Sequence, residues 1–263
     1  MPEIAEVELL RRQLSVLERA VVQSVVTDGN PRFAAARASA GQAFGLAERK
    51  GKWLSIPLEV DGLPVGTNLG IHLGMTGQLT LSPPAAVPIK WRCRFDFADG
   101  RTLYLADSRG FGRVVYASMP FGGVTLGIEP GETGFADAVR KAGGNGGAPI
   151  VLSLLAQNKV AGIGAYVAQE GLWRSGISPH RRHIDDGSIT TLASCLEAVV
   201  LDSLATGGMT MRDYRRLDGS VGDAYNHLDC YGRAGQPCRR CGGLLRKDRI
   251  GGRGVTWCPS CQH

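Results

Sequence analysis

The stretch WRCRFDFADGRTLYLAD, residues 91–107, alternates between apolar and charged side chains with the period of a β-strand. Asp99-Gly100 then supplies a dipeptide that is typical of a tight hairpin turn. The alternation predicts one apolar face, formed by Trp91, Cys93, Phe95 and Phe97. Similar alternation runs from about residue 45 to 117, so we predict an antiparallel β-sandwich or barrel.

Apolar residues recur at helical spacing before this region. They are Ile4, Val7, Leu10, Leu14, Leu17 and Val21. Pro2 suits the first turn of a helix, and Glu3 and Glu6 favour the positive end of its dipole. The residues themselves therefore predict an amphipathic N-terminal helix. Because Pro2 is small, we also expect Met1 to be removed, which would leave a secondary amine at the chain terminus.

Glycine dominates residues 122–149, which end in AGGNGGAP and predict a linker. Helical periodicity follows over residues 150–176 and 188–208, with Ser188 as the expected N-cap and Gly207-Gly208 as the stop. The predicted organisation is a β domain over residues 1–121, a linker over 122–149, a helical domain over 150–229 and a cysteine module over 230–263.

The cysteine module contains CRRCGGLLRKDRIGGRGVTWCPSC, in which two C-x2-C pairs are separated by sixteen residues. Each pair can present two thiolates from one tight turn, so the spacing predicts one structural Zn²⁺. The expected ligands are Cys238, Cys241, Cys258 and Cys261. Disulfides or a redox pair are the alternatives. The residues between the pairs predict a hairpin whose tip carries Arg253 between glycines, suited to a phosphate or simply solvated.

The net charge of +6 is concentrated near the C-terminus. Residues 209–263 contain ten Lys and Arg and five Asp and Glu, which gives +5. This bias suggests a polyanionic partner, with a solvated basic face as the alternative. The sequence has neither a long uncharged apolar run nor a signal-peptide pattern, so we expect an intracellular protein with no membrane partner. We expect no organic cofactor, since no further nucleotide-binding motif is apparent.

Several motifs in the same order resemble the bacterial formamidopyrimidine-DNA glycosylases and the related endonuclease VIII glycosylases. They are MPEIAEVE, RKGKWL, HLGMTG, DSRGFGR, LGIEP, VAGIGAYVAQEGLWRSGISP, GGMTMRDY and the cysteine module. The resemblance covers almost the full length. It implies an α+β fold, with an N-terminal helix and an antiparallel β-sandwich followed by a helix-two-turn-helix domain and a C-terminal zinc-finger hairpin.

The resemblance also implies a function. Such proteins are base-excision-repair DNA glycosylases with an abasic-site lyase activity that proceeds by β or β/δ elimination. The expected partner is double-stranded DNA containing a damaged base or an abasic site, with the damaged nucleotide flipped out of the stack. We expect a bacterial, cytoplasmic, nucleoid-associated monomer.

The resemblance assigns the chemistry to the N-terminus. The Pro2 amine matches the family's nucleophile, which attacks the sugar C1′ and forms an iminium. An α-amino group has a pKa near 8, so roughly a tenth of it is free base at neutral pH. Glu3 matches the acid/base carboxylate, Glu6 a second carboxylate near the site, and Lys52 a lysine that contacts DNA phosphate. On the residues alone, Glu6 could be helix surface and Lys52 a strand-edge charge.

The resemblance further assigns DNA contacts to His72, Met75, Arg109, Phe111, Glu170 and Arg253. Met75, Arg109 and Phe111 match the residues that fill the gap left by the flipped nucleotide. His72 matches a phosphate contact, and Arg253 matches the phosphate clamp of the finger. Core packing is the alternative for Met75 and Phe111, and a strand histidine is the alternative for His72.

The chain departs from the family pattern at Ala5, Gly110, Val151 and Ala165. The family usually has a proline at the position of Ala5, a second arginine at that of Gly110, a lysine at that of Val151 and an asparagine at that of Ala165. Three of these changes remove polar or cationic contacts, which Arg215, Arg216 or Arg246 could replace. We therefore expect a lesion preference altered from 8-oxoguanine. The alternative is a lesion- or abasic-site-binding protein with little turnover, whereas a general zinc-finger regulator would leave the N-terminal motif unexplained.

Overall fold

The computed structural model describes residues 2–81, 91–143, 147–211 and 214–263. The chain divides into two compact units. The first comprises Met1–Val124 and Leu204–Tyr225, and the second comprises Thr125–Ser203 and Asn226–His263. The segment Leu204–Tyr225 was expected in the helical domain, and its place in the first unit differs from that expectation. The physical reason is backbone hydrogen bonding to the N-terminal helix, where Met209 N–H donates to Glu6 and Leu217 N–H donates to Gln13.

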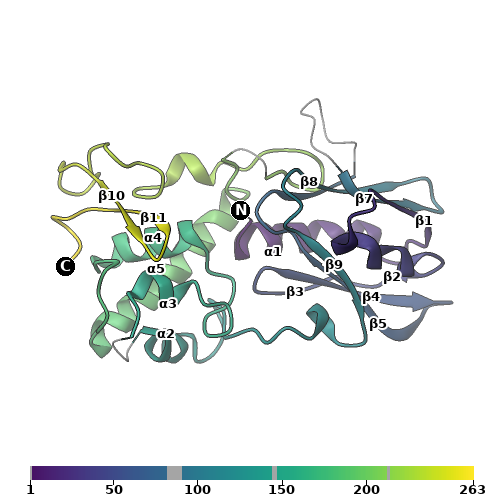
Figure 1. Ribbon diagram of the computed structural model, residues 1–263, viewed down its shortest axis with the longest axis horizontal. Helices are drawn as coiled ribbons and strands as arrows, with labels where there is room; N and C mark the ends of the chain where they lie inside the picture. The colour runs from purple at the N-terminus through teal and green to yellow at the C-terminus, as the bar shows by residue number, and fades with distance from the viewer. Residues whose placement is uncertain (1, 82–90, 144–146, 212–213) are drawn as a thin grey trace. The chain divides into compact units, whose positions relative to one another are not determined.

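Two antiparallel sheets form most of the first unit (Figure 1). One has the strand order β1-β7-β8-β6, and the other has the order β2-β4-β5-β9, with β3 beside β4. The strands are β1 Val22–Thr27, β2 Ala43–Phe44, β3 Glu48–Lys50, β4 Trp53–Val60, β5 Leu63–His72, β6 Gly77–Thr80, β7 Trp91–Phe97, β8 Thr102–Asp107 and β9 Arg113–Ala117. Apolar side chains from both sheets share one core, which confirms the predicted sandwich.

The β7–β8 hairpin forms as its sequence predicts. Phe97 N–H donates to Arg101 O at 2.9 Å, and Gly100 has a φ of 86°, a conformation that suits glycine. Cys93 and Phe95 are buried. Trp91 is only partly buried, because the register of the β7–β8 pair shifts between Trp91 and Cys93.

The N-terminal helix α1 spans Ile4–Gln13 and continues as a 3₁₀ turn, η1, over Leu14–Leu17. Its apolar side belongs to the same core as the sheets. The helical pattern does not extend to Val21, which is 44% exposed and forms a β-bridge with Ala43. Strand β1, which follows, was not predicted, although its β-branched residues favour a strand.

Helices form most of the second unit. They are α2 Phe135–Gly143, α3 Ile150–Leu154, α4 Ala165–Ser175 and α5 Asp186–Ala205. Helix α2 lies inside the expected linker because Phe135 and Val139 bury an apolar face there; residues 144–146 of that stretch lie outside the described residues. Asp185, rather than Ser188, caps α5, since its carboxylate accepts the Ser188 N–H at 2.9 Å.

Three further 3₁₀ segments lie in the described residues: η2 Pro31–Ser39, η3 Pro120–Gly123 and η4 Ala224–His227. By length and composition alone, α5 could cross a membrane, with a mean hydropathy of 1.4. Ile189, Leu192 and Leu196 of this helix are buried. Core helices meet the same criterion, so α5 adds no evidence for a membrane span.

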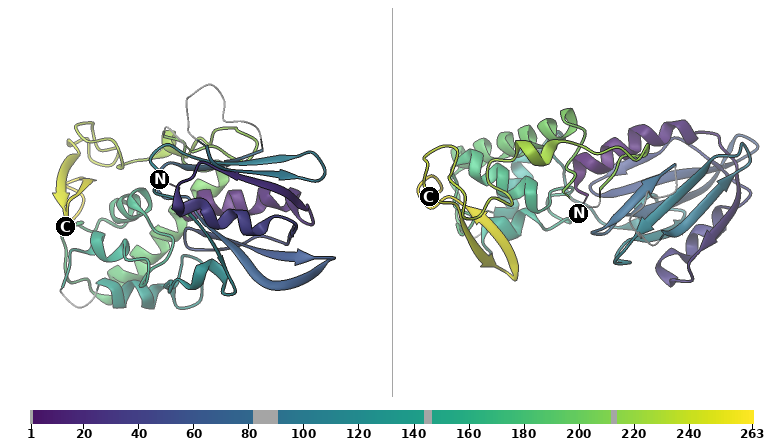
Figure 2. Two further views of the ribbon diagram at one scale, coloured as in Figure 1. Left: turned by 45° about the vertical axis from the view of Figure 1, so that its right-hand side comes forward. Right: turned by 90° about the horizontal axis from the view of Figure 1, so that it is seen from above.

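A C-terminal hairpin joins β10 Arg246–Ile250 to β11 Arg253–Trp257 (Figure 2). Gly251 and Gly252 form its tip with φ values of 55° and 77°. A Cβ atom at Gly251 would lie 2.6 Å from Leu152 Cδ1 of α3, so the tip needs glycine for this close approach. The predicted finger hairpin is confirmed, with Arg253 as its first strand residue after the tip.

Candidate functional site

Pro2 and Glu3 begin the described part of the chain, immediately before α1, and both are buried. Glu3 is the N-cap of α1 and forms a capping box with Glu6, in which Glu3 N–H donates to Glu6 Oε2 at 2.8 Å. The second oxygen of Glu6 accepts the Met209 N–H, also at 2.8 Å. Glu6 thus fixes the backbone beside Pro2 and joins it to the segment after α5. Met1 lies outside the described residues.

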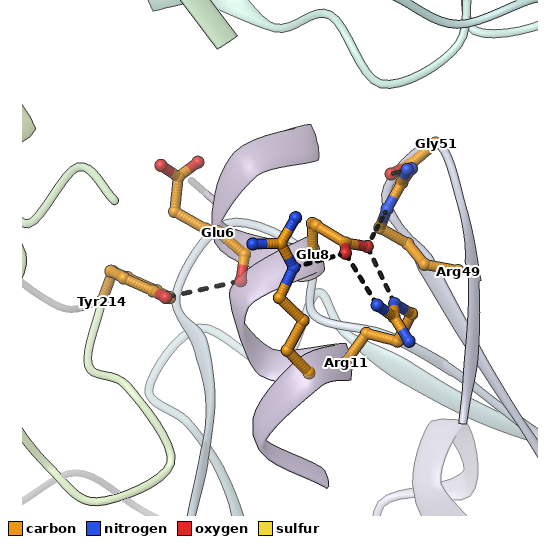
Figure 3. Close-up of polar contacts among 7 residues, drawn as sticks. Glu6, Glu8, Arg11, Arg49, Gly51 and Tyr214 are labelled. Atoms are coloured by element: carbon orange, nitrogen blue, oxygen red, sulfur yellow. Dashed lines mark hydrogen bonds and ion pairs between the residues drawn. The ribbon is translucent and has the colours of Figure 1, made fainter. Parts of the chain in front are cut away.

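Tyr214 adds a contact on the same side of α1. Its hydroxyl donates to the Glu6 carbonyl oxygen at 3.4 Å (Figure 3). Burial and the neighbouring Glu6 raise the pKa of Tyr214, so the phenol stays protonated and keeps its donor. Gly208 permits the approach, because a Cβ atom there would lie 3.0 Å from the Tyr214 ring and 3.1 Å from Leu9.

Glu8 organises the opposite side of α1 (Figure 3). Its carboxylate accepts hydrogen bonds from Arg11, Arg12 and Arg49 at 2.9, 2.8 and 3.1 Å. Partial burial alone would raise the pKa of Glu8, but these hydrogen bonds outweigh it and lower the pKa to about 2. Arg49 also donates to the Gly51 carbonyl oxygen at 3.2 Å. The network therefore connects α1 to the turn that carries Lys52.

Lys52 lies in the turn before β4, and His72 ends the adjacent strand β5, where it pairs with Trp53. The Lys52 residue is buried, and the centroid of the His72 ring lies 5.0 Å from that of the Trp53 ring. Burial, Arg113 and Lys52 lower the pKa of His72 to about 4, so the imidazole is neutral at pH 7. Because His72 Nδ1 accepts the Gly74 N–H at 3.2 Å, the proton resides on Nε2.

The structure brings together three side chains that were predicted to contact DNA. Arg109 lies with its guanidinium carbon 4.6 Å from the Phe111 ring centroid and its Nη1 3.3 Å from Met75 Sδ. Met75 is 42% exposed and Phe111 is 48% exposed. The core-packing alternative is therefore wrong for both residues. We call Met75, Arg109 and Phe111 the loop cluster.

A buried carboxylate holds the loop cluster in place. Asp107, at the end of β8, accepts hydrogen bonds from the Thr76 hydroxyl, the Arg109 N–H and the Gly112 N–H. A Cβ atom at Gly74 would lie 2.5 Å from Gly112 N, so glycine is required where the two loops meet. Sequence reasoning missed Asp107, and the only signal was an acidic residue closing a strand inside DSRGFG.

Glu170 of α4 is fully buried, although the resemblance assigns it to the DNA contacts. Its carboxylate accepts the N–H groups of Asp229, Cys230 and Tyr231 at 3.0, 2.8 and 2.6 Å. Burial raises the pKa of Glu170, while the three backbone donors oppose that shift. In this structure Glu170 fixes the segment that leads into the cysteine module, and it presents no surface to a ligand.

Gln169, the neighbouring residue, holds the finger strand and was not predicted. Its Oε1 accepts the Thr256 N–H at 2.7 Å, and its Nε2 donates to Gly254 O at 3.4 Å. Both contacts lie on β11 within three residues after the exposed Arg253. Ala165, which begins α4, lies one helical turn before Gln169 and is half-buried.

The four predicted zinc ligands converge. Their Sγ atoms all lie within 4.8 Å of one another, with Cys238 to Cys261 at 4.0 Å and Cys241 to Cys258 at 3.5 Å. Tetrahedral Zn²⁺ with Zn–S bonds of about 2.3 Å places its sulfurs roughly 3.8 Å apart. The site therefore fits one structural Zn²⁺. Trp173 Nε1 donates to Cys238 Sγ at 3.4 Å, which anchors the site to α4.

Val151 and Gly110, two further departures from the family pattern, lie in different surroundings. Val151 is buried in α3, and Gly110 has a φ of 65°. Arg215 and Arg216 both bond to carbonyl oxygens of their own segment, at Tyr214 and Val221, respectively. Replacement of lost DNA contacts by these arginines remains a prediction.

Two family models match parts of this chain. Residues 1–114 match the family model of the formamidopyrimidine-DNA glycosylase N-terminal domain, and residues 235–263 match that of the zinc finger found in FPG and IleRS. The formamidopyrimidine-DNA glycosylase of Dechloromonas aromatica is 36% identical over 281 residues, and that of Parasynechococcus marenigrum is 34% identical over 282 residues. Each of these alignments covers 100% of both chains.

Solved structures show the same relationship. The MutM (Fpg) protein of Thermus thermophilus is 32% identical, with a TM-score of 0.86 over 99% of this chain and 98% of that one. The Lactococcus lactis Fpg, in complex with DNA containing an abasic site, is 28% identical, with a TM-score of 0.84 over 99% of each chain. With the N-terminal motif, the β-sandwich and the four-cysteine finger all in place, the chain belongs to the formamidopyrimidine-DNA glycosylase family of base-excision-repair glycosylase/lyases.

Proposed function

We propose that this protein excises a damaged base from duplex DNA and then cleaves the abasic site through the Pro2 amine. The observation that best supports this proposal is the fixed backbone beside Pro2, where one oxygen of Glu6 accepts the Glu3 N–H and the other accepts the Met209 N–H. Fixing a nucleophile before the substrate arrives lowers the entropic barrier of the covalent step.

The chemistry begins once Met1 has been removed. The Pro2 nitrogen forms a bond to the sugar C1′, the glycosidic bond breaks, and the base leaves with that electron pair and a proton. Opening of the sugar ring, whose oxygen takes up a proton, gives an iminium. Loss of a proton from C2′ passes the C–H electron pair to the iminium and gives an enamine, which then expels the 3′ phosphate with the electron pair of the C3′–O bond. Hydrolysis then frees the amine.

Three neighbouring residues take distinct roles in this proposal. Glu3 protonates the sugar ring oxygen and moves protons during elimination. Glu6 acts as a positioning residue, because both of its oxygens already accept backbone N–H groups. Lys52 contacts a DNA phosphate close to the lesion.

The DNA contacts follow from exposure and charge. The loop cluster combines a flexible apolar chain, a guanidinium and an aromatic ring on one exposed surface, which suits the gap left by a flipped nucleotide. Neutral His72 offers a phosphate its Nε2–H, and exposed Arg253 offers another a full charge. Related Lactococcus lactis proteins have been solved with Fapy-dG and abasic-site DNA, which supports damaged duplex DNA as the partner.

We further propose that the preferred lesion is not 8-oxoguanine. Gly110 and Ala165 lack the guanidinium and amide usual in the family, and buried Val151 offers no cation. Each lost hydrogen bond to a charged phosphate would cost about 1.5–3 kcal/mol. Single-turnover excision from duplexes that each carry 8-oxoguanine, a ring-opened purine or an oxidised pyrimidine tests this point; fastest excision of 8-oxoguanine would refute it.

Borohydride trapping tests the central proposal. Protein with verified Met1 removal should form a covalent adduct with an abasic duplex, and Pro2→Gly should trap much more slowly. Pro31→Gly, at the first turn of η2, is the matched control and should trap like wild type. Tight binding without an adduct would instead support a binding protein with little turnover.

A further inference from the structure

Arg92 belongs to the charged side of the alternating pattern in β7, yet it is only 8% exposed. Its guanidinium donates through Nε to the Asp107 carbonyl oxygen at 2.6 Å and through Nη2 to the Ser108 carbonyl oxygen at 3.1 Å. Through Nη1 it donates to Asp28 Oδ2 at 2.8 Å. The Arg92 guanidinium thus donates hydrogen bonds to the carbonyl oxygens of the two residues that directly precede Arg109.

The partner Asp28 is itself held in place. Asp28 N–H donates to the Arg92 carbonyl oxygen at 3.0 Å, and its Oδ1 accepts the Asn30 N–H at 3.0 Å. Side-chain exposures of 10% for Arg92 and 8% for Asp28 show that the pair is screened from solvent. We call Asp28, Asn30 and Arg92 the Arg92 network.

Gly110 lies directly over the Arg92 network. A Cβ atom at Gly110 would lie 3.2 Å from Arg92 Nη2 and 3.3 Å from Asn30 Nδ2. With a φ of 65°, the residue also adopts a conformation that favours glycine. The loop that carries Arg109 and Phe111 is therefore hydrogen-bonded to Arg92 at the carbonyls of residues 107 and 108 and approaches the Arg92 network closely at Gly110.

We infer that Arg92 is a positioning residue for the loop cluster, which it holds in the geometry needed to enter the gap in the DNA. The inference rests on the proposed function. An exposed loop normally loses conformational freedom when it binds, and prior ordering reduces that cost. A purely structural role for Arg92 would affect the stability of the whole first unit. A positioning role affects insertion separately from the chemistry at Pro2.

The test variant is Arg92→Lys, which keeps the charge beside Asp28 but cannot reach both carbonyls as a planar fork. The matched control is Arg94→Lys in the same strand, because Arg94 pairs with Asp96 and is 38% exposed. Thermal unfolding checks that both variants fold. Asp28→Asn serves as a second test variant, since it releases Arg92 from its ion pair with little change in volume.

Insertion is measured by the fluorescence of 2-aminopurine placed opposite a tetrahydrofuran abasic analogue in a duplex. Chemistry is measured by borohydride trapping on a single-stranded abasic oligonucleotide, which has no opposite strand and no gap to fill. Arg92→Lys should lower the insertion equilibrium about tenfold, the factor that corresponds to one hydrogen bond from a charged group. Its trapping rate on the single strand should stay within about twofold of wild type, and Arg94→Lys should match wild type in both assays.

Phe111→Ala should weaken the insertion signal, and combining it with Arg92→Lys should cause little further loss, because both changes act on one event. Unchanged insertion in Arg92→Lys and Asp28→Asn would overturn the inference. Equal losses of insertion and single-strand trapping would also overturn it, since they indicate a general defect. If wild-type protein fails to trap at all, the proposed function fails instead.

Discussion

Acid should destabilise the first unit through His72. The pKa of His72 falls from about 6.5 to about 4 on folding, with burial as the main cause and Arg113 and Lys52 as further causes. The unfolded chain therefore binds a proton between these two values that the folded chain does not. Stability from the neutral imidazole is complete above about pH 6.5 and is lost as the pH falls toward 4. A shift of about 2.5 pKa units corresponds to roughly 3.4 kcal/mol as an upper limit.

The variant His72→Asn isolates this contribution, because the Asn side chain can still accept the Gly74 N–H and does not titrate. Between pH 7 and pH 4, the wild-type free energy of unfolding in urea should fall about 2–3 kcal/mol more than that of the variant. His180→Asn is the control, since His180 is half-exposed and lies in the other unit. NMR titration of the His72 ring protons measures the pKa of His72 in the folded protein directly.

Two results would refute this reasoning. A measured His72 pKa near 6.5 would mean that burial and the two cations do not act as described. A wild-type stability that runs parallel to that of His72→Asn from pH 7 to pH 4 would mean that the folded and unfolded states bind the same number of protons at this residue.

Three further changes have defined outcomes. Glu8→Gln should lower the free energy of unfolding in urea by about 1–2 kcal/mol at pH 7. This difference should disappear as the pH falls from about 4.5 to about 2, because the Glu8 carboxylate of the wild type becomes protonated over that range. Glu170→Gln should destabilise the segment that leads into the cysteine module by about 1–3 kcal/mol, since an amide cannot accept all three backbone N–H groups. The variant should therefore lose zinc to a chelator faster than wild type, and an unchanged rate of zinc loss would contradict this prediction. Gly110→Arg should weaken binding to abasic duplex rather than restore a contact, through strain of about 1–2 kcal/mol and repulsion by Arg92; tighter binding would contradict this.

Local rules explain which parts of the fold were predictable. The β7–β8 hairpin follows from alternation and from the turn at Asp99-Gly100, and the finger follows from two cysteine pairs and three glycines around its tip. Each of these signals is contained within about twenty-five residues. A sequence pattern is sufficient where neighbouring residues supply most of the contacts.

Long-range contacts explain what was missed. The segment Leu204–Tyr225 joins the first unit through the bond from Met209 to Glu6, whose partners are separated by 203 residues. Its own composition gives no sign of that partner. Val21 fits both a helical period and a β-branched strand, and only its pairing with Ala43 decides between them.

The site shows the same division. The resemblance predicted the exposed loop cluster, but Asp107, Arg92 and Gln169, which hold backbone groups near the predicted contacts, were not predicted. A buried polar side chain and a solvated one look alike in a sequence. They differ only in the partners that the fold supplies, and these buried residues are the ones whose loss would leave backbone groups unsatisfied.

Ala165 and Gly110, two departures from the family pattern, each lie near one of these buried residues. Gln169 follows Ala165 in α4, and Arg92 lies against Gly110. Ala165 begins α4, is half-buried, and precedes Gln169 by one turn, so the finger strand keeps an amide contact while the position itself remains partly exposed. Gly110 is more tightly enclosed, because a Cβ atom there would lie 3.2 Å from Arg92 Nη2 and 3.3 Å from Asn30 Nδ2. A single substitution can therefore return an amide at residue 165, whereas a guanidinium at residue 110 also requires a change in the Arg92 network. The two losses are separable by mutation for that reason.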